Sequence, residues 1–502
     1  MHTTRMQLMI ALLLLGVVFG GQFFLPFAQP VSQLRIETGN AQSEVANPGS
    51  VYLPFVFLKS PLLTRFGIEM AHVTEVGGLS KVVESGANWI RLNGVQWGEI
   101  EPVRYSPPVY NWDALSGLEQ ELQTAAEQGF RVILVVRDTP SWAQLVAGSS
   151  CGPIKPEYYT AFGEFLAALV GRLGKFPYEV DYWEIWNEPD VSINTTNTTY
   201  GCWGDLNDEA YFGGDHYGAM LKTVYPYIKQ ADSTAQVLVG GLLLYCNPTA
   251  LFQCEKDDDS HKFLGGMLAA GAGPYFDGIS FHAYDSFFYV GGAIGMYGNT
   301  NWNTLWNNNG PVIAAKAEFI RSVLQFYLVP DKYLINTESA LLCGKATDPP
   351  GQFPCETASN SAFELTKAYY VPQAYAAAIA ADLRANVWFN LAGWRNSGLI
   401  YHNKTGRPAF YAYKFAREEL RDAAYVGRIT ESDIGAITGV VGHKFRQGGK
   451  IIWLIWSLDG ADHVVTLSQA PLAVYDVDGT PIVISDNSLT VTIQPYYVEF
   501  PN

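Results

Sequence analysis

Short apolar runs alternate with longer stretches of helical periodicity between residues 61 and 427. The runs are rich in β-branched and aromatic residues, which favour strands. They lie at 66–70, 89–92, 132–136, 182–186, 237–239, 278–281, 333–335 and 387–389. Helical patterns such as 115–128, 158–173 and 369–384 separate them, and Gly86 and Gly129 stand where helices are expected to end.

Eight strands that alternate with helices predict an α/β fold with a parallel sheet buried on both faces. Closed on itself, such a sheet is a (β/α)8 TIM barrel, whose usual length is about 250 residues. Because the predicted domain spans 61–427, its loops after the strands must be long. The carboxyl ends of the strands are expected to carry the active site.

The pattern changes after residue 428, where strands are predicted at 451–456, 463–467, 472–477, 482–484, 489–493 and 496–500. Turn signals such as Asp459-Gly460 and Asp478-Gly479 separate them. We therefore predict a C-terminal antiparallel β-sandwich domain over 428–502. A carbohydrate-binding module is one reading of it, and a structural sandwich packed on the barrel is the reading we favour by analogy.

The N-terminus reads as a targeting segment. Arg5 precedes a continuous apolar stretch at 8–21 that 23–28 extends, so 1–28 predicts a signal peptide or an uncleaved signal anchor. The extended stretch is close to the roughly 20 residues that span a bilayer. Residues 29–60 are expected to be a linker or N-terminal extension. The protein is therefore predicted to be secreted, or tethered to a membrane and facing outside.

Export permits disulfides. The short spacings favour pairing Cys246 with Cys254 and Cys343 with Cys355, which leaves Cys151 for Cys202, although fifteen pairings are possible in principle. No CxxC or HExxH spacing occurs, so we predict neither a metal site nor a cofactor. The formal net charge of −16 argues against nucleic acid as a partner. The oligomeric state is not indicated.

Candidate chemistry begins at the strand 182–186, which Pro189 must end because proline cannot donate a ladder hydrogen bond. Glu188 therefore lies where this strand runs into a loop, beside Asn187. A second carboxylate, Glu338, follows the seventh apolar run in the same way. Parallel barrel strands end on one face, so both carboxylates are expected in one cleft. Such a pair suits glycosidic bond cleavage, with retention at a separation of ~5–5.5 Å and inversion at ~6.5–9.5 Å.

These residues resemble the clan A glycoside hydrolases, most closely the family 39 or family 5 (cellulase-like) type. The resemblance covers nearly everything after residue 60. It rests on these segments and residues: Trp186-Asn187-Glu188-Pro189, Glu338, Arg91 at the end of the second strand, 139–143 after the third, His282-Ala283-Tyr284 after the sixth, and the C-terminal β domain.

The resemblance implies a retaining mechanism in which Glu188 is the acid/base and Glu338 the nucleophile. Asn187 would hold the 2-hydroxyl of the sugar, and His282 would bond the sugar from the strand end. Arg91 and Tyr284 would keep Glu338 ionised. Trp388 would form the floor under a sugar ring, ahead of Trp394.

Each supporting residue also has a structural reading. Arg91 could instead be a buried ion-pair partner of Glu69, Glu99 or Glu101, and Trp388 could be core. Glu184 shares strand periodicity with Glu188, so it should point into the barrel and need a partner, and we assign it to structure.

The function that follows is a retaining hydrolase that cleaves β-glycosidic bonds in an extracellular poly- or oligosaccharide. Two alternatives remain open. One is a barrel that binds glycans without cleaving them, and the other is a transglycosylase that remodels an exported polysaccharide. The sugar, the linkage and the choice between endo and exo action are not determined by the sequence.

Overall fold

The computed structural model describes residues 64–195, 197, 199–245, 259–290, 293–295, 310–343 and 361–502. The predicted targeting segment at 1–28 and the extension at 29–60 lie outside these residues. Of the helices in the described ranges, none combines the length and the apolar character needed to cross a bilayer.

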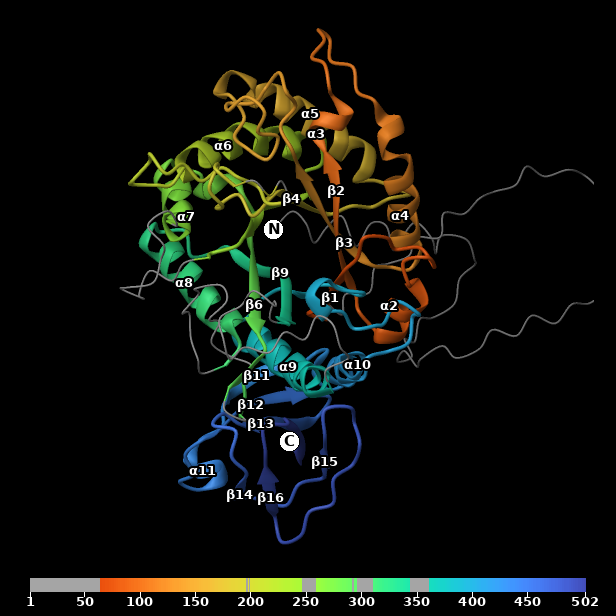
Figure 1. Ribbon diagram of the computed structural model, residues 1–502, viewed down its shortest axis with the longest axis vertical. Helices are drawn as coiled ribbons and strands as arrows, with labels where there is room; N and C mark the ends of the chain where they lie inside the picture. Colours follow the sequence, from red (N-terminus) through yellow and green to blue (C-terminus); the bar gives the residue numbers. More distant parts are fainter. Residues whose placement is uncertain are drawn as a thin grey trace, which may run out of the picture. The chain divides into compact units, whose positions relative to one another are not determined.

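Eight parallel strands close into a barrel in the order β1-β10-β9-β6-β5-β4-β3-β2 (Figure 1). The strands are β1 (Phe66–Glu69), β2 (Trp89–Gln96), β3 (Arg131–Arg137), β4 (Tyr182–Asn187), β5 (Gln236–Leu242), β6 (Gly278–Ser286), β9 (Tyr333–Leu342) and β10 (Asn386–Trp388). Each of the eight predicted apolar runs falls on one of them, which confirms the TIM barrel.

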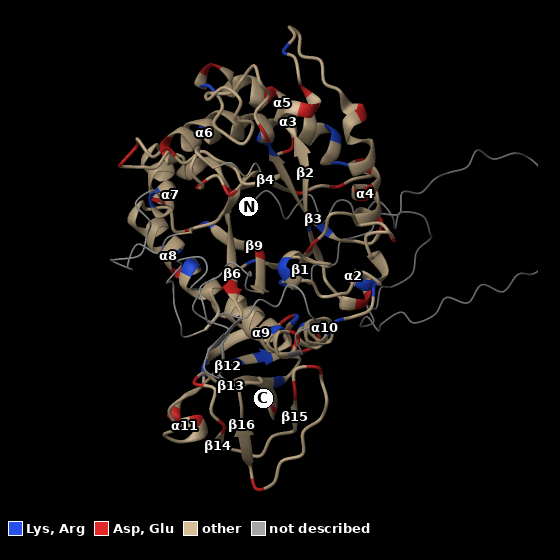
Figure 2. Ribbon diagram, in the orientation of Figure 1, with Lys and Arg blue, Asp and Glu red and all other residues tan. Residues whose placement is uncertain are grey.

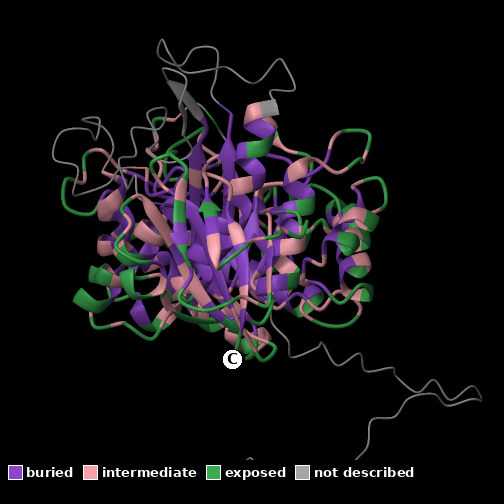
Figure 3. Cartoon of the chain, turned by 90° about the horizontal axis from the view of Figure 1, so that it is seen from below, coloured by how far each residue is buried: buried purple, intermediate pink, exposed green. Residues whose placement is uncertain are grey.

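One long helix follows each barrel strand. These helices are α2 (Leu79–Ser85), α4 (Ser116–Glu127), α5 (Tyr159–Leu173), α6 (Gly214–Ala231), α7 (Ser260–Ala269), α8 (Val312–Phe326), α9 (Ser361–Ala380) and α10 (Pro408–Leu420). Gly86 ends α2 with φ at 75°, a left-handed conformation that glycine adopts without steric cost. Figure 3 shows the strands as the buried centre and the exposed residues on the helices and loops outside them.

Short elements lie between the long ones. They are α3 (Trp97–Ile100) and α11 (Glu431–Ile434), the 3₁₀ turns η1 (Trp112–Leu115), η2 (Pro156–Tyr158), η3 (Gly273–Tyr275) and η4 (Trp394–Asn396), and the hairpin of β7 (Phe288–Val290) with β8 (Ala293–Gly295).

Side chains that point inward from the strands fill the barrel in layers, as expected for this architecture. One apolar layer contains Trp89, Ile133, Tyr182, Leu238 and Ile335. Because side chains alternate along a strand, Arg91 and Glu184 also point inward, two residues beyond Trp89 and Tyr182. The charged layer of the barrel therefore lies directly above an apolar one.

The C-terminal part forms an antiparallel β-sandwich, as predicted. A five-stranded sheet has the order β11-β12-β13-β17-β15, and β14 pairs with β16. These strands are β11 (Ala424–Arg428), β12 (Val440–Gln447), β13 (Lys450–Ser457), β14 (His463–Thr466), β15 (Ala473–Tyr475), β16 (Ser488–Val491) and β17 (Tyr496–Pro501).

Two details of this domain differ from the prediction. Segment 482–484 forms no strand, and its neighbour Pro481 makes only an isolated bridge with Tyr475. Conversely, β11 and β12 were not predicted, because β11 is mostly exposed and β12 mixes glycine, histidine and charged residues with its apolar ones.

The sandwich contacts the barrel through helices α9 and α10. Lys450 of β13 donates to both carboxylate oxygens of Glu419 on α10, at 3.2 and 2.9 Å, and also bonds Glu499 of β17. Basic residues of the described chain are dispersed over the helices and the C-terminal sheet (Figure 2). The absence of nucleic acid as a partner stays a prediction.

Candidate active site

Arg91 of β2 is fully buried and joins the charged side chains of the barrel. Its Nη1 donates to Glu338 Oε1 at 2.6 Å and to Glu69 Oε2 at 2.7 Å. Its Nη2 donates to Glu184 Oε1 at 2.5 Å and to Asn187 Oδ1 at 2.7 Å, and Nε donates to the same Glu184 oxygen at 3.2 Å. A guanidinium has five N–H donors, and these bonds use all of them. Arg91 is therefore both a residue of the site and the ion-pair partner of Glu69 and Glu184.

Glu338 lies within β9 and receives hydrogen bonds from residues of two other strands, β2 and the adjacent β6. Besides Arg91, the hydroxyl of Tyr284 on β6 donates to Glu338 Oε2. His282 is paired with Glu338 across the sheet, and its Nδ1 lies 3.5 Å from Oε2. Both predicted partners of Glu338, Arg91 and Tyr284, therefore contact it directly.

Glu188 follows the last residue of β4, and its φ of 49° turns the chain into the loop. This left-handed conformation is uncommon for a residue with a side chain, and such strain concentrates at functional sites. The amide of Glu188 donates to the carbonyl of Gly241 at 2.9 Å, which anchors the turn to β5. His282 Nδ1 lies 2.7 Å from Glu188 Oε1.

Glu188, Glu338 and His282 meet at the carboxyl end of the barrel. One carboxylate oxygen of each Glu and a ring nitrogen of His282 lie within 4.8 Å of one another. Three such groups could also hold a metal ion, so the prediction of a site without a metal stays a prediction. Both carboxyls open into a cavity of about 410 Å³. Its lining residues are Glu69, Asn93, Asn187, Glu188, Asn197, Thr199, Tyr200, Leu243, Tyr284, Glu338, Phe389 and Trp394.

The two carboxyls differ in what opposes the effect of burial. Burial raises the pKa of Glu188 well above its usual value, and the negative charges of Glu338 and Asp190 raise it further, while the positive charges of Arg91 and Lys316 have a smaller, lowering effect. Burial also raises the pKa of Glu338, but the charge of Arg91 and the hydrogen bond from Tyr284 lower it. Glu188 is therefore the carboxyl that is suited to hold a proton, and Glu338 has the direct donors that favour its ionised form.

His282 is held against Glu188 in its neutral form. Burial, together with the positive charges of Arg91 and Lys316, lowers the pKa of the imidazole well below its usual value. Its ring lies over Gly241, where an added Cβ would come within 2.1 Å of Nε2. Glycine at position 241 is therefore needed for His282 to reach Glu188.

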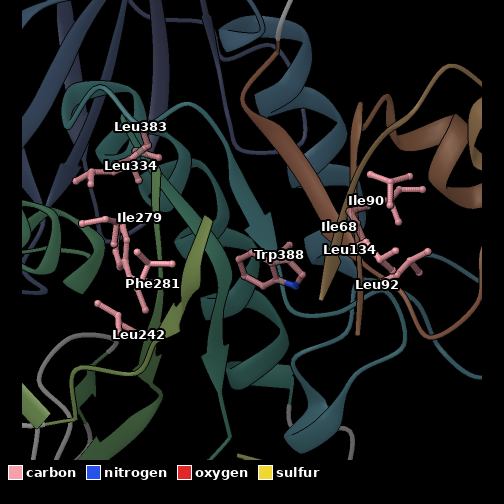
Figure 4. Close-up of a cluster of buried hydrophobic side chains, with 14 of the residues drawn as sticks. Ile68, Ile90, Leu92, Leu134, Leu242, Ile279, Phe281, Leu334, Leu383 and Trp388 are labelled. Carbon is pink, nitrogen blue, oxygen red and sulfur yellow. The ribbon is translucent and has the colours of Figure 1, made fainter. Parts of the chain in front are cut away.

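The prediction that Trp388 forms the floor under a sugar is wrong. Trp388 is fully buried, its Nε1 donates to the carbonyl of Ser397 at 2.9 Å, and Figure 4 shows it among buried hydrophobic side chains. The next residue, Phe389, lines the cavity instead, because neighbouring residues of an extended chain point to opposite sides. Trp394, which we ranked lower, also lines the cavity and is 46% exposed.

Four predicted residues, Arg91, His282, Tyr284 and Glu338, lie within strands rather than at strand ends. Arg91 is the third residue of β2, and the strands β6 and β9 continue beyond His282 and Glu338. The apolar runs mark only the buried beginnings of these strands. The polar residues that follow belong to the same strands and point into the site.

The predicted disulfide between Cys151 and Cys202 is present. It joins the loop after β3 to the loop after β4, whose Thr199 carbonyl accepts a bond from Asn187 Nδ2 at 3.2 Å. Cys343 is also disulfide-bonded, while Cys246, Cys254 and Cys355 lie outside the described residues. The confirmed bridge thus ties down a loop that lines the cavity.

Seven lining residues were not predicted for the cavity: Glu69, Asn93, Asn197, Thr199, Tyr200, Leu243 and Phe389. Glu69 was predicted only as a possible partner of Arg91. Its position in the sequence could have indicated the cavity. Glu69 is the last residue of β1, and the active site of such a barrel lies at the carboxyl ends of the strands. Tyr200 lies in a loop, where no periodicity marks it.

Solved structures of several glycoside hydrolases share the fold of this chain. A family 39 glycoside hydrolase from Bacteroides cellulosilyticus superposes with a TM-score of 0.61 at 16% identity, over 88% of this chain and 81% of that one. A family 30 endoxylanase from Clostridium papyrosolvens gives 0.55 at 13% identity, over 88% and 97%. The family 30 xylanase C from Talaromyces cellulolyticus gives 0.56 at 16% identity, over 87% and 96%.

Sequence comparison is less informative. No family model matches the chain. A curated protein of Oryza sativa subsp. japonica, "Beta-glucosidase-like SFR2, chloroplastic", is 31% identical over 131 residues, which cover 25% of this chain and 19% of that protein. The chain thus spans about a fifth of the length of this curated relative.

Proposed function

We propose that the protein is a retaining glycoside hydrolase that cleaves β-glycosidic bonds in an extracellular poly- or oligosaccharide. The observation that carries the proposal is the approach of Glu188 and Glu338, whose nearest oxygens lie within 4.8 Å across one cavity. Inverting enzymes need roughly 6.5–9.5 Å between carboxyls to admit a water, whereas retaining enzymes need roughly 5–5.5 Å. The shorter separation supports double displacement.

In the first step, Glu188 donates its proton to the leaving glycosidic oxygen while a Glu338 oxygen attacks the anomeric carbon. A covalent glycosyl ester forms on Glu338 and the leaving sugar departs as an alcohol. In the second step, Glu188 takes a proton from water, the resulting hydroxide displaces Glu338, and the sugar is released with its configuration retained. Asn187 is the residue that would bond the 2-hydroxyl, and its hydrogen bonds with Arg91 and the Thr199 carbonyl support this role.

The electrostatics support this assignment of roles. The raised pKa of Glu188 favours the protonated form of its carboxyl, so activity should fall as the pH rises through that pKa. Neutral His282 keeps Glu188 in position without adding a charge that would favour its ionised form. The charge of Arg91 and the hydrogen bond from Tyr284 stabilise the ionised form of Glu338. They offset part of the rise in its pKa that burial causes.

The site of action is the second part of the proposal. The apolar stretch at 8–28 supports export. The protein would then be secreted, or tethered to a membrane with its active site facing outside. Carbohydrate is the partner that this site suits.

The proposal is tested with aryl β-glycosides, β-glucan, xylan and mannan, using the wild type, Glu338→Gln and Glu188→Gln. Glu338→Gln should lose about 10⁴-fold or more in kcat on every substrate, because the nucleophile acts in the transition state. Glu188→Gln should lose most on poor leaving groups and least on 2,4-dinitrophenyl glycosides, which depart without a proton.

Glu75→Gln, an exposed change outside the cavity, is the matched control. Proton NMR of the first-formed sugar reports retention or inversion directly. Equal activity of the wild type and Glu338→Gln, or an inverted product, would contradict the proposal. Products longer than the substrate would indicate transglycosylation by the same residues.

A further inference from the structure

A third carboxyl group lies in the cavity beside the proposed nucleophile. Glu69 is the last residue of β1 and lies in register with Arg91 on β2. Its Oε2 accepts from the same Nη1 atom that donates to Glu338, at 2.7 and 2.6 Å respectively. Two oxygens that share one nitrogen must be close neighbours. Glu69 therefore lies beside the space that the sugar attacked by Glu338 would occupy.

The side chain of Glu69 is not closed off by packing. It keeps 11% of its surface exposed and lines the cavity. No hydrogen bond to its Oε1 occurs among the described residues, whereas Oε2 is held by Arg91. Arg91 thus fixes the carboxyl and leaves one oxygen toward the space that a sugar would fill.

Arg91, the positively charged side chain beside the cavity, has no N–H group left to donate to a ligand. All five N–H groups of Arg91 are used by Glu69, Glu184, Glu338 and Asn187. The lining residues in the described part of the chain include no Lys or Arg. They do include Glu69, Glu188 and Glu338, together with amides and hydroxyls. Among the lining residues that the structure describes, a ligand with its own carboxylate would meet three carboxyl groups and no Lys or Arg.

We propose that Glu69 determines specificity by binding hydroxyl groups of the sugar next to Glu338, so that this cavity accepts a neutral sugar and rejects a uronic acid. The inference rests on the proposed function and names the class of its substrate. Hydroxyls donate well to a carboxylate, and hydrogen bonds with an ionised partner are the stronger kind. A desolvated sugar carboxylate would be left without a partner, which is costly.

The protonation of Glu69 does not reverse this preference. Burial is the main cause that raises the pKa of Glu69 to about 8, so near neutral pH the group exists in both forms. The protonated carboxyl can still accept from one sugar hydroxyl and donate to another. It supplies no positive charge, so a uronic acid gains nothing from it.

The test uses matched pairs of aryl β-glycosides that differ only at C6, namely glucoside with glucuronide and galactoside with galacturonide. We expect kcat/KM for each uronide to be at least about 100-fold below that of its neutral partner, since opposed like charges cost several kcal/mol. Glu69→Gln should raise KM for the neutral sugar. Above about pH 8, where Glu69 is ionised, it should also narrow the ratio of neutral to uronide kcat/KM by about tenfold, because one negative charge is removed.

Glu75→Gln is the matched control, and circular dichroism with thermal melting confirms that each variant is folded. Binding is measured separately, by the shift in melting temperature with methyl glycosides of the same pairs. A uronide cleaved or bound as well as its neutral partner would overturn the inference.

The two proposals fail in different ways. A preference for binding neutral glycosides without any cleavage would count against the proposed function and keep the inference. If the glycosides are cleaved but Glu69→Gln leaves the ratio of neutral to uronide kcat/KM unchanged, the proposed function stands. Glu69 then does not determine specificity, and the inference is overturned. Absence of binding to either member of every pair would overturn the inference as well.

Discussion

Replacement of Gly241 by alanine should separate Glu188 from the histidine that positions it. The Cβ of an alanine would lie 2.1 Å from His282 Nε2, 2.8 Å from Cδ2 and 2.9 Å from Cε1. Ordinary contacts of a Cβ begin at 3.4 Å, so the ring would have to retreat by about 1.3 Å, the difference between the two distances. Its Nδ1 lies 2.7 Å from Glu188 Oε1, and such a movement breaks that bond.

The expected loss follows from this displacement. A misplacement of about 1 Å at a catalytic group can lower activity by about 100-fold, so we expect kcat/KM to fall by that factor. Because His282 is fully buried, the same crowding should lower the free energy of unfolding by about 1–3 kcal/mol. Both quantities are measured on purified protein, by hydrolysis of an aryl glycoside with a poor leaving group and by urea unfolding.

Gly171→Ala provides the matched control. Gly171 lies in α5, and a Cβ there would meet nothing within 4 Å, so activity should be unchanged and stability should rise by up to about 1 kcal/mol. For Gly241→Ala, the loss of activity should be smaller on 2,4-dinitrophenyl glycosides than on poor leaving groups, because this leaving group departs without an acid. A folded Gly241→Ala protein with wild-type kcat/KM would refute the role we give to His282.

The remaining predictions concern stability. The pKa of Glu69 is raised by burial from 4.5 to about 8, so the native state holds a proton that the unfolded chain releases. Stability should therefore fall as the pH rises from 4.5 to about 8, and Glu69→Gln should flatten this slope in urea unfolding. If the unfolding free energies of the wild type and Glu69→Gln change equally with pH, the raised pKa of Glu69 is contradicted. The bridge between Cys151 and Cys202 closes a loop with a sequence separation of 51, so replacing both by serine should lower the unfolding free energy by up to about 4 kcal/mol. A variant with unchanged unfolding would show that the native loops hold without it.

The barrel was predictable because its strands are buried on both faces. Runs such as 132–136 are continuous apolar segments, and eight of them separated by helices leave few alternative architectures. The strand ends were less predictable. Polar residues such as Glu338 belong to β9, but a pattern built on apolar residues stops before them.

Errors occurred where tertiary context outweighed local pattern. Segment 482–484 has two isoleucines, and they pack against the sandwich core without forming a strand. Trp388 and Phe389 are both aromatic neighbours at the end of β10, and sequence alone could not assign which one reaches the cavity. That choice depends on the direction in which the strand leaves the barrel.

The sequence by itself determined the fold class. It also predicted the two carboxyls Glu188 and Glu338, and its cysteine spacings favoured the disulfide between Cys151 and Cys202 without excluding other pairings. Burial pattern, strand order and the convergence of parallel strand ends follow from local residues and general rules. Only the tertiary structure decided that all five N–H groups of Arg91 donate to residues of the site and that Glu69 lies beside Glu338. It also showed that Gly241 makes room for His282. These are distances between residues far apart in the chain, and closure of the barrel sets them.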